Sequence, residues 1–300
     1  MRYEYTQSLS LDHEDLSKVD LHSLLNIMNI LISLFYQAGR AIGDRDRLEP
    51  AIEKVYVIVE FMQDSSRIKG YLENFKEFKT ITLDTLKRVE EDFPDRYNAR
   101  VAEEVESVIN ILEIRSIEWL KRVEHPQQWD VLEVRRLKQN FLDVFKAVEK
   151  YSQGRYRIVE RPEEHGSDDY LIELAFRSKQ KNVVYIPSVF QDVMRDTLLN
   201  ARKYTPLGGH ISGVLSTNRD SILWEVKDDG IGIPEVDLPR IIELGFRAGN
   251  VTDRRTMGAG FGLTKAYLVA KQFSGRMWID SEVGKGTLLT IEIPFPDVKM

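Results

Sequence analysis

Three polar blocks between Gln191 and Gly262 constrain the fold of this chain more than any other feature. The first block is helical, because apolar residues from Phe190 to Ala201 recur at steps of three and four. The opposite face of this predicted helix carries polar side chains at the same period. They are Asp192, Asp196, Asn200, Lys203 and Tyr204. We therefore expect an amide oxygen, a cation and an aromatic ring to face one ligand.

The second block, Trp224 to Pro234, is a predicted strand that ends in acidic residues and then in two glycines. At the end of this strand, Asp228 is placed to accept a hydrogen bond from an exocyclic amine. Gly230 and Gly232 allow the backbone to approach a flat ring, because no Cβ intervenes. This combination suits a purine.

The third block, Gly258 to Tyr267, is a glycine-rich loop that leads into the first turn of a helix. Free backbone N–H groups and the positive end of the helix dipole would bind phosphates there. Arg247, Arg254 and Arg255 lie just upstream, in a segment rich in glycine, asparagine and threonine. We expect this segment to close over the ligand as a lid.

In this order the three blocks resemble the GHKL family of ATP-binding domains, and within it the catalytic domain of bacterial sensor histidine kinases. The N box of the family matches Asp196 to Thr205, the G1 box matches Asp228 to Ile233, and the G2 box matches Gly258 to Leu263. A further glycine motif at Gly284 to Thr287 takes the place of the last motif of the family. The resemblance covers about the last half of the chain.

The resemblance implies a role for each matching residue. Asn200 would be the Mg²⁺ ligand, which fits the preference of Mg²⁺ for few protein oxygens. Asp228 would read adenine, Lys203 would contact phosphate, and Asp196 would support Mg²⁺ binding or proton transfer. The other residues expected to bind ATP are Tyr204, Gly230, Gly232, Ile233, Arg247, Gly258, Gly260, Phe261, Gly262, Leu263 and Thr287.

The chain before Tyr156 follows an almost wholly helical pattern. Its first long helix, from Asp20 to about Ala41, and the next, from Leu48 to about Lys69, carry matching apolar stripes. These stripes predict an antiparallel hairpin, and two such hairpins would form a four-helix bundle.

A polar line runs along the first of these helices. It consists of His22, Asn26, Asn29 and Ser33. The line resembles the H box of histidine kinases, in which a histidine accepts the phosphoryl group. Ser23 stands where that box has an acidic residue that takes the proton, and Ile27 stands where it has a helix-bending proline. We expect His22 to be the phosphoacceptor, with Asp20 as the alternative base.

Two more amphipathic helices are predicted at Val101–Val123 and Trp129–Tyr151, with their apolar faces packed against each other. They would serve as a dimer stem, a partner-docking bundle or a sensor. Three domains follow from these patterns. They are a helical hairpin for dimerisation and histidine phosphotransfer at 1–78, an additional helical region at 79–154, and the ATP-binding domain at 155–300.

The last domain is predicted to be an α/β sandwich, so that the fold class is a helical bundle followed by α/β. Its strands are expected at 156–160, 170–176, 183–186, 211–215, 222–226, 277–280 and 288–293. The helices expected to cover one face of the sheet are 188–204, 237–245 and 261–273.

Composition excludes several classes of function. The 42 basic and 48 acidic residues give a net charge of −6, which argues against a general binder of nucleic acid or anionic membranes. Without cysteine, the chain has no disulfide, thiolate nucleophile or cysteine-built zinc site. The longest apolar run, near Ile27 to Tyr36, is too short to span a bilayer. We expect a cytoplasmic protein with no membrane segment in this chain.

These features predict a histidine autokinase that binds MgATP, phosphorylates His22 and passes the phosphoryl group to an aspartate on a response regulator receiver domain. A homodimer is expected. One alternative is a degenerate kinase whose ATP pocket acts as a switch for interactions, which Ser23 favours. Another is a GHKL ATPase that directs water, which Lys203, Tyr204 and the H-box match make less favourable.

Overall fold

A computed structural model of the chain describes residues 2–61, 70, 75–152, 154–180, 182–251 and 260–296. Its contacts divide the chain into two compact units. One unit, the α/β unit, consists of Met1–Leu9 and Gln127–Met300, and the other, the helical unit, consists of Ser10–Pro126.

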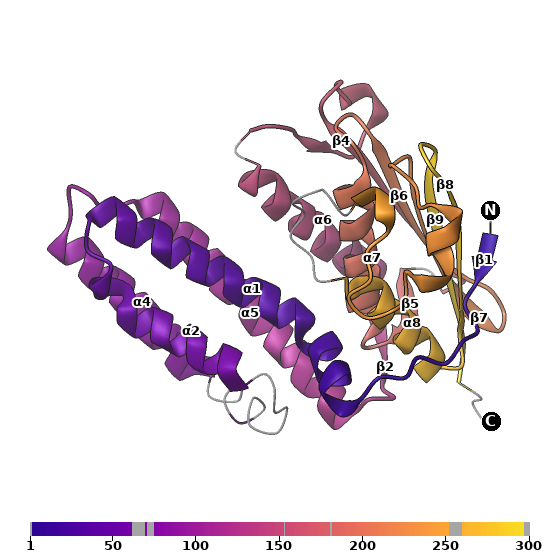
Figure 1. Ribbon diagram of the computed structural model, residues 1–300, viewed down its shortest axis with the longest axis horizontal. Coiled ribbons are helices and arrows are strands. Elements are labelled where there is room, and N and C mark those ends of the chain that lie inside the picture. Colours follow the sequence, from indigo (N-terminus) through magenta and orange to yellow (C-terminus); the bar gives the residue numbers. More distant parts are fainter. Residues whose placement is uncertain are drawn as a thin grey trace. The chain divides into compact units, whose positions relative to one another are not determined.

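The described helices of the helical unit share a single apolar core. They are α1 (His13–Ile42), α2 (Glu49–Phe61), α4 (Phe75–Asp92) and α5 (Ala99–Glu124), as Figure 1 shows. Buried Met28, Ile52, Phe78 and Ile109 contribute one side chain from each helix. The predicted α1–α2 hairpin is therefore completed to four helices by the same chain. The predicted second helix ends at Phe61 within the described part, and residues 62–69 lie outside it.

The partner predicted for α5 is wrong. Val105 and Leu112 on α5 are buried in the core of the helical unit. Leu137 and Phe141, their expected partners, lie in the core of the α/β unit instead. The two apolar stripes were expected to face each other, but each of them packs into the core of a different unit.

The α/β unit contains a sheet of seven strands in the order β1, β8, β9, β7, β6, β4, β3. Their bounds are β1 (Arg2–Glu4), β3 (Ile158–Val159), β4 (Tyr170–Arg177), β6 (His210–Thr217), β7 (Ser221–Asp228), β8 (Arg276–Glu282) and β9 (Gly286–Pro294). β4 runs parallel to β3 and β6, and the other neighbours are antiparallel. A separate pair joins β2 (Trp129–Glu133) to β5 (Val183–Pro187).

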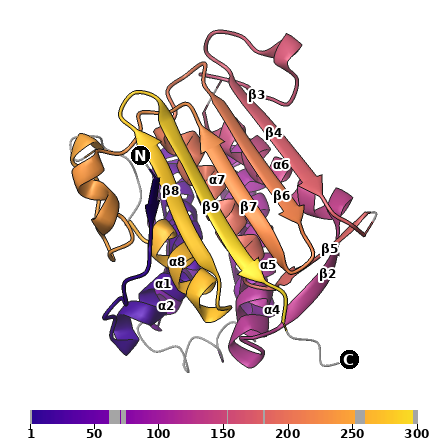
Figure 2. The ribbon, with the colours of Figure 1, turned by 90° about the vertical axis from the view of Figure 1, so that its right-hand side faces the viewer.

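Three helices cover one face of the large sheet. They are α6 (Val134–Tyr151), α7 (Phe190–Tyr204) and α8 (Gly262–Gln272), all behind the sheet in Figure 2. The core between them includes Trp224, which is fully buried and donates from Nε1 to Thr197 Oγ1 at 3.1 Å. No described helix is long and apolar enough to cross a membrane.

The start of the α/β unit differs from the predicted boundary at residue 155. Residues Trp129–Glu133 form a strand rather than the first turn of a helix, because they pair with β5. The following helix, α6, packs its stripe of Leu137, Phe141 and Phe145 into the core of this unit. The second segment of the unit therefore begins at Gln127, and an N-terminal strand that the pattern did not predict, β1, completes its sheet.

The helix expected at 237–245 is also shorter than predicted. The segment Glu235–Arg240 forms a 3-10 helix, η3, and turns follow it. Pro239 inside η3 has no N–H to donate to a longer helical ladder. Leu238 and Ile242 still bury their side chains in the core of the α/β unit.

Candidate functional site

Helix α7 presents the predicted polar face at its C-terminal end. Its apolar stripe, which includes Val193, Leu198 and Ala201, is buried against the sheet. Asn200 and Lys203 on the other side are half-buried. The stripe predicted to face a ligand therefore exists over the last turns of the helix.

The chain after β7 closes against the end of this helix. Ile231 N donates to Tyr204 O at 3.1 Å, so the turn that follows Asp228 touches the last residue of α7. Asn250 Nδ2 donates to Gly232 O at 2.8 Å, which brings the segment beyond η3 to the same turn. The first and second polar blocks are thus adjacent.

Asp228 is a buried carboxylate at the end of β7. Its side chain is 8% exposed, and its Oδ1 accepts a hydrogen bond from Gly230 N at 2.9 Å. Burial raises the pKa of this carboxyl to about 6, although the N–H groups of Gly230 and Thr287 act in the opposite direction. A desolvated carboxyl held in one orientation has the properties needed to read a polar ring edge.

Thr287 faces Asp228 across the β7–β9 ladder and belongs to a small hydroxyl network. Its Oγ1 lies 2.9 Å from Ser281 Oγ, and the same Ser281 oxygen accepts from Ile233 N at 2.9 Å. The network fixes Ile233, whose side chain packs against the core of this unit. Ser281 was not predicted, since an isolated serine in a strand gives no sequence pattern.

The glycine loop reaches Asn200 through Gly262, the first residue of α8. A Cβ at Gly262 would lie 2.7 Å from Asn200 Nδ2, so any other residue there would displace the Asn200 amide. Gly260 has a φ of +77°, and its Cβ position is filled by the backbone of Gly245 and Phe246. Phe261 precedes α8, and Leu263 packs against the core. Gly258, Arg254 and Arg255 lie outside the described residues.

Two cations meet beside this loop. Burial lowers the pKa of Lys203, and the nearby positive charges of Arg247 and Arg202 lower it further. Arg247 donates from Nη2 to Val251 O at 3.0 Å, which holds it in the segment before the glycine loop. Positive charges that repel one another across a half-buried site are stabilised by a bound anion, and a phosphate chain is such an anion.

Asp192 does not face the ligand as predicted. It is 2% exposed, and its carboxylate contacts Arg195 at 3.0 Å and Lys265 at 3.2 Å. Lys265, itself 3% exposed, also lies 3.5 Å from Asp196 Oδ2. Asp192 lies two turns before Asn200, where α8 covers α7, so its charge is paired with a lysine from α8. Lys265 was missed because the sequence pattern does not show which helix covers which.

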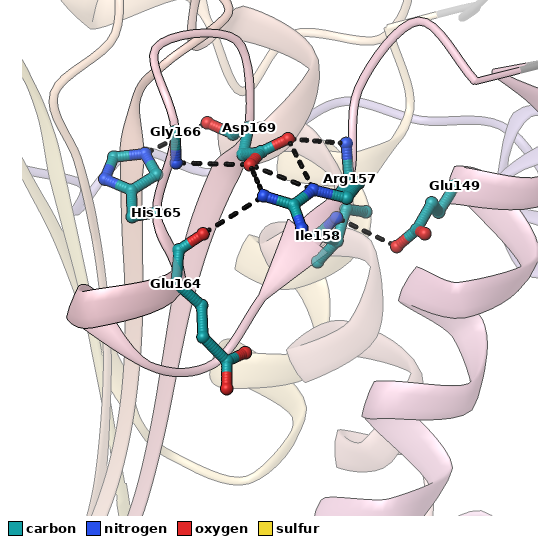
Figure 3. A network of polar contacts seen from close by, with 7 residues as sticks. All are labelled: Glu149, Arg157, Ile158, Glu164, His165, Gly166 and Asp169. Carbon is teal, nitrogen blue, oxygen red and sulfur yellow. Dashed lines mark hydrogen bonds and ion pairs between the residues drawn. The ribbon is translucent and has the colours of Figure 1, made fainter.

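A polar network fixes the segment that leads into β4, and Figure 3 shows its members. The Asp169 carboxylate accepts hydrogen bonds from Arg157 Nε at 3.1 Å and from Gly166 N at 3.1 Å. The Arg157 guanidinium lowers the pKa of Asp169 to about 2. Glu149 on α6 accepts from Ile158 N at 2.8 Å, so the network joins α6 to β3.

Aromatic residues beside this network hold the C-terminal end of α7. Arg202 Nη1 donates to Tyr156 Oη at 2.6 Å, and its guanidinium lies over the rings of Tyr156 and Tyr170. Tyr170 Oη donates to Thr205 O at 3.2 Å. Arg202 thus belongs to this aromatic cluster, and its contacts fix the turn that carries Lys203.

The residues present fit a magnesium nucleotide. Within the described ranges, no three His, Cys, Asp or Glu side chains gather as a metal site. The Asn200 amide, whose Nδ2 is its atom nearest to Gly262, has a single oxygen to offer a metal, which suits an ion that takes most of its ligands from water and phosphate. Asp228 matches a purine amine, and Lys203 with Arg247 matches the phosphates.

His22 lies in α1, within the helical unit, and its side chain lies outside the described part of the chain. Asn26, one turn further along the helix, and Asn29 are exposed. The role predicted for His22 stays a prediction, as do the individual roles predicted for the residues of the nucleotide site.

Comparison with known proteins agrees with this geometry. Residues 186–297 match the family described as histidine kinase-, DNA gyrase B-, and HSP90-like ATPase. The chain is 35% identical over 107 residues to the sensor histidine kinase WalK of Bacillus subtilis (strain 168), a match that covers 35% of this chain and 18% of WalK. It is 31% identical over 102 residues to the sensor histidine kinase RppB of Synechocystis sp. (strain ATCC 27184 / PCC 6803 / Kazusa), covering 34% of this chain and 22% of RppB.

A solved catalytic domain of histidine kinase ThkA aligns with 56% of this chain and 97% of its own, at 17% identity and a TM-score of 0.40. The match to the histidine kinase-, DNA gyrase B-, and HSP90-like ATPase family lies wholly within the α/β unit. The resemblance to bacterial sensor histidine kinases and the predicted fold class, a helical region followed by an α/β domain, are confirmed. The chain spans less than a quarter of the length of WalK or RppB.

Proposed function

We propose that this chain is an ATP-dependent protein-histidine kinase of a two-component system. The observation that supports this most strongly is that Gly262 approaches Asn200 while the turn after Asp228 contacts Tyr204, so that segments of three separate elements lie at the end of α7. The names of the relatives support the kinase class, because the curated matches quoted above are sensor histidine kinases.

In this proposal the purine amine donates to the Asp228 carboxylate, and Lys203 and Arg247 bind the phosphates. Asn200 holds Mg²⁺ through its amide oxygen, and the ion, when bound, neutralises charge on the phosphates. The chain's own contribution is to orient the ATP, since phosphoryl transfer depends mainly on positioning and charge stabilisation.

The proposed acceptor is His22. The lone pair of its Nε2 attacks the γ-phosphorus, the bond from that phosphorus to the bridging oxygen breaks, and ADP leaves. The proton on Nδ1 then passes to a base, for which Asp20 is the candidate. An aspartate on a response regulator receiver domain takes the phosphoryl group next. We place this reaction in the cytoplasm, where ATP is supplied, and in a homodimer.

The contacts of Asp196 favour a kinase over an ATPase that activates water. In the ATPase alternative, Asp196 would be the base one turn before Asn200. Its Oδ2 lies 3.5 Å from the buried ammonium of Lys265, so this carboxylate is already engaged by a cation from α8. We therefore assign Asp196 a supporting role.

Incubation with γ-labelled ATP and Mg²⁺ tests the proposal. We expect a label on the protein that is labile in acid and stable in base, and that is lost in His22→Gln and in Asn200→Asp. His125→Gln, which changes an exposed histidine, is the matched control and should keep the label. Nucleotide binding without any label would favour the switch protein, and release of free phosphate without label would favour the ATPase.

A further inference from the structure

The N-terminal segment Arg2–Leu9, here called the strap, is built into the α/β unit. Its first residues form β1, which pairs with β8 along the edge of the sheet, as Figure 2 shows. Glu4 and Arg276 form a two-contact ion pair at 2.8 and 3.0 Å, which fastens β1 to β8. Tyr5 N then donates to Met277 O at 3.1 Å.

Beyond β1 the strap contacts two other elements. Tyr5 is 1% exposed, and its Oη donates to Leu238 O of η3 at 2.7 Å. Gln7 Nε2 donates to Pro239 O, the next carbonyl of η3, at 3.0 Å. Tyr267 of α8, also 1% exposed, donates from its hydroxyl to Gln7 O. The strap therefore connects η3 to α8.

Both elements, η3 and α8, are connected to the residues of the candidate site that are expected to bind phosphate. On the η3 side, Asp237 Oδ2 accepts from Gly249 N at 2.7 Å, and the Arg240 guanidinium lies 4.3 Å from the centre of the Phe246 ring. These contacts hold the segment that contains Arg247. On the other side, Tyr267 lies on the helix whose first residue, Gly262, approaches Asn200.

We propose that Tyr5 and Gln7 are positioning residues for ATP, an inference that rests on the proposed function. They hold η3 and α8 at a fixed separation, and this separation sets the distance between Arg247 and the Gly260–Gly262 loop. The hydrogen bonds described for the strap go to β8, η3 and α8, whereas Asp228, which reads the purine in the proposal, lies at the end of β7. Loss of its contacts to η3 and α8 should therefore weaken binding of the triphosphate and leave binding of the nucleoside unchanged.

The test compares Tyr5→Phe and Tyr267→Phe with the wild-type chain by equilibrium dialysis against MgATP and, separately, against adenosine. Each variant removes one hydroxyl and keeps the ring. A hydrogen bond of this kind is worth about 1 kcal/mol, so we expect the Kd for MgATP to rise about three- to tenfold and the Kd for adenosine to stay constant. Glu4→Gln, which weakens the ion pair between β1 and β8 and keeps the hydrogen bonds from the strap to η3 and α8, is the control and should change neither Kd.

Unfolding in urea accompanies each titration, so that Kd values are compared only where the chain is folded. Lower stability with wild-type affinity for MgATP would overturn the proposal and leave the strap a purely structural element. Equal weakening of MgATP and adenosine would overturn it as well. A wild-type chain that binds neither ligand would contradict the proposed function itself, which separates the two failures.

Discussion

The buried carboxyl of Asp228 makes nucleotide affinity depend on pH in a predictable direction. Burial raises its pKa from 3.8 to about 6, because the ionised form loses hydration. The purine amine donates to the ionised carboxylate in the proposed complex. The affinity for MgATP should therefore be highest well above pH 6, and it should fall as the pH decreases and the carboxyl takes up a proton.

The magnitude follows from the pKa. At pH 5, one unit below it, about nine-tenths of the free protein carries the proton on Asp228. If only the ionised form binds the purine, the Kd at pH 5 is about tenfold higher than at pH 8, or ~1.4 kcal/mol. The folded protein should also lose stability as pH rises from about 4 to 6, since a raised carboxyl pKa favours the protonated folded state.

The assay is equilibrium dialysis of MgATP from pH 5 to pH 8 with the wild-type chain and Asp228→Asn. Phosphate groups also titrate near pH 6, but they do so with both proteins. The ratio of the wild-type affinity to the Asp228→Asn affinity therefore reports the titration of Asp228 alone. We expect this ratio to change about tenfold in favour of the wild type between pH 5 and pH 8. A ratio that stays constant would refute the assignment of Asp228 as the purine reader.

Three further predictions concern the framework of the site. Gly262→Ala places a Cβ 2.7 Å from Asn200 Nδ2 and should weaken MgATP binding about tenfold by dialysis, whereas Gly249→Ala, with ordinary contacts, should not. Lys265→Met leaves two acidic side chains without their buried cation and should lower the free energy of unfolding by about 3 kcal/mol in urea. Adding Asp192→Leu to Lys265→Met should restore part of the lost free energy of unfolding. A double variant no more stable than the Lys265→Met variant would contradict this prediction. Asp169, with a pKa lowered to about 2, should stabilise the fold above pH 4 and lose this effect towards pH 2, so Asp169→Asn should flatten the acid side of the stability curve.

The sequence predicted the strands of the α/β unit other than β1 and β2, and the contact of the first polar block with the other two. Leu171 to Phe176 and Leu289 to Ile293 alternate clearly, and β4 and β9 form there. The blocks met as expected because each sits at the end of a regular element. Asn200 lies near the end of α7, and Asp228 is the last residue of β7.

Where prediction failed, long-range packing decided the structure. The strand β2 was taken for helix because Trp129 to Glu133 is short and continues into a helical stripe, and only its partner β5 shows its true state. The strap was missed for the same reason, since β1 pairs with residues far along the chain. Asp192 was misplaced because the period of a helix gives its faces and not the neighbour that covers each face.

In the proposed site, Asn200, Asp228 and the loop at Gly262 together bind one magnesium nucleotide. Equilibrium dialysis of labelled ATP with and without Mg²⁺, using the wild-type chain, Asn200→Ala and Asp228→Asn, tests it most directly. The account predicts one ATP per chain, Mg²⁺-dependent binding, and affinity at least about tenfold lower in each variant. A wild-type chain that retains no ATP, or two variants that bind as tightly as the wild type, would contradict it.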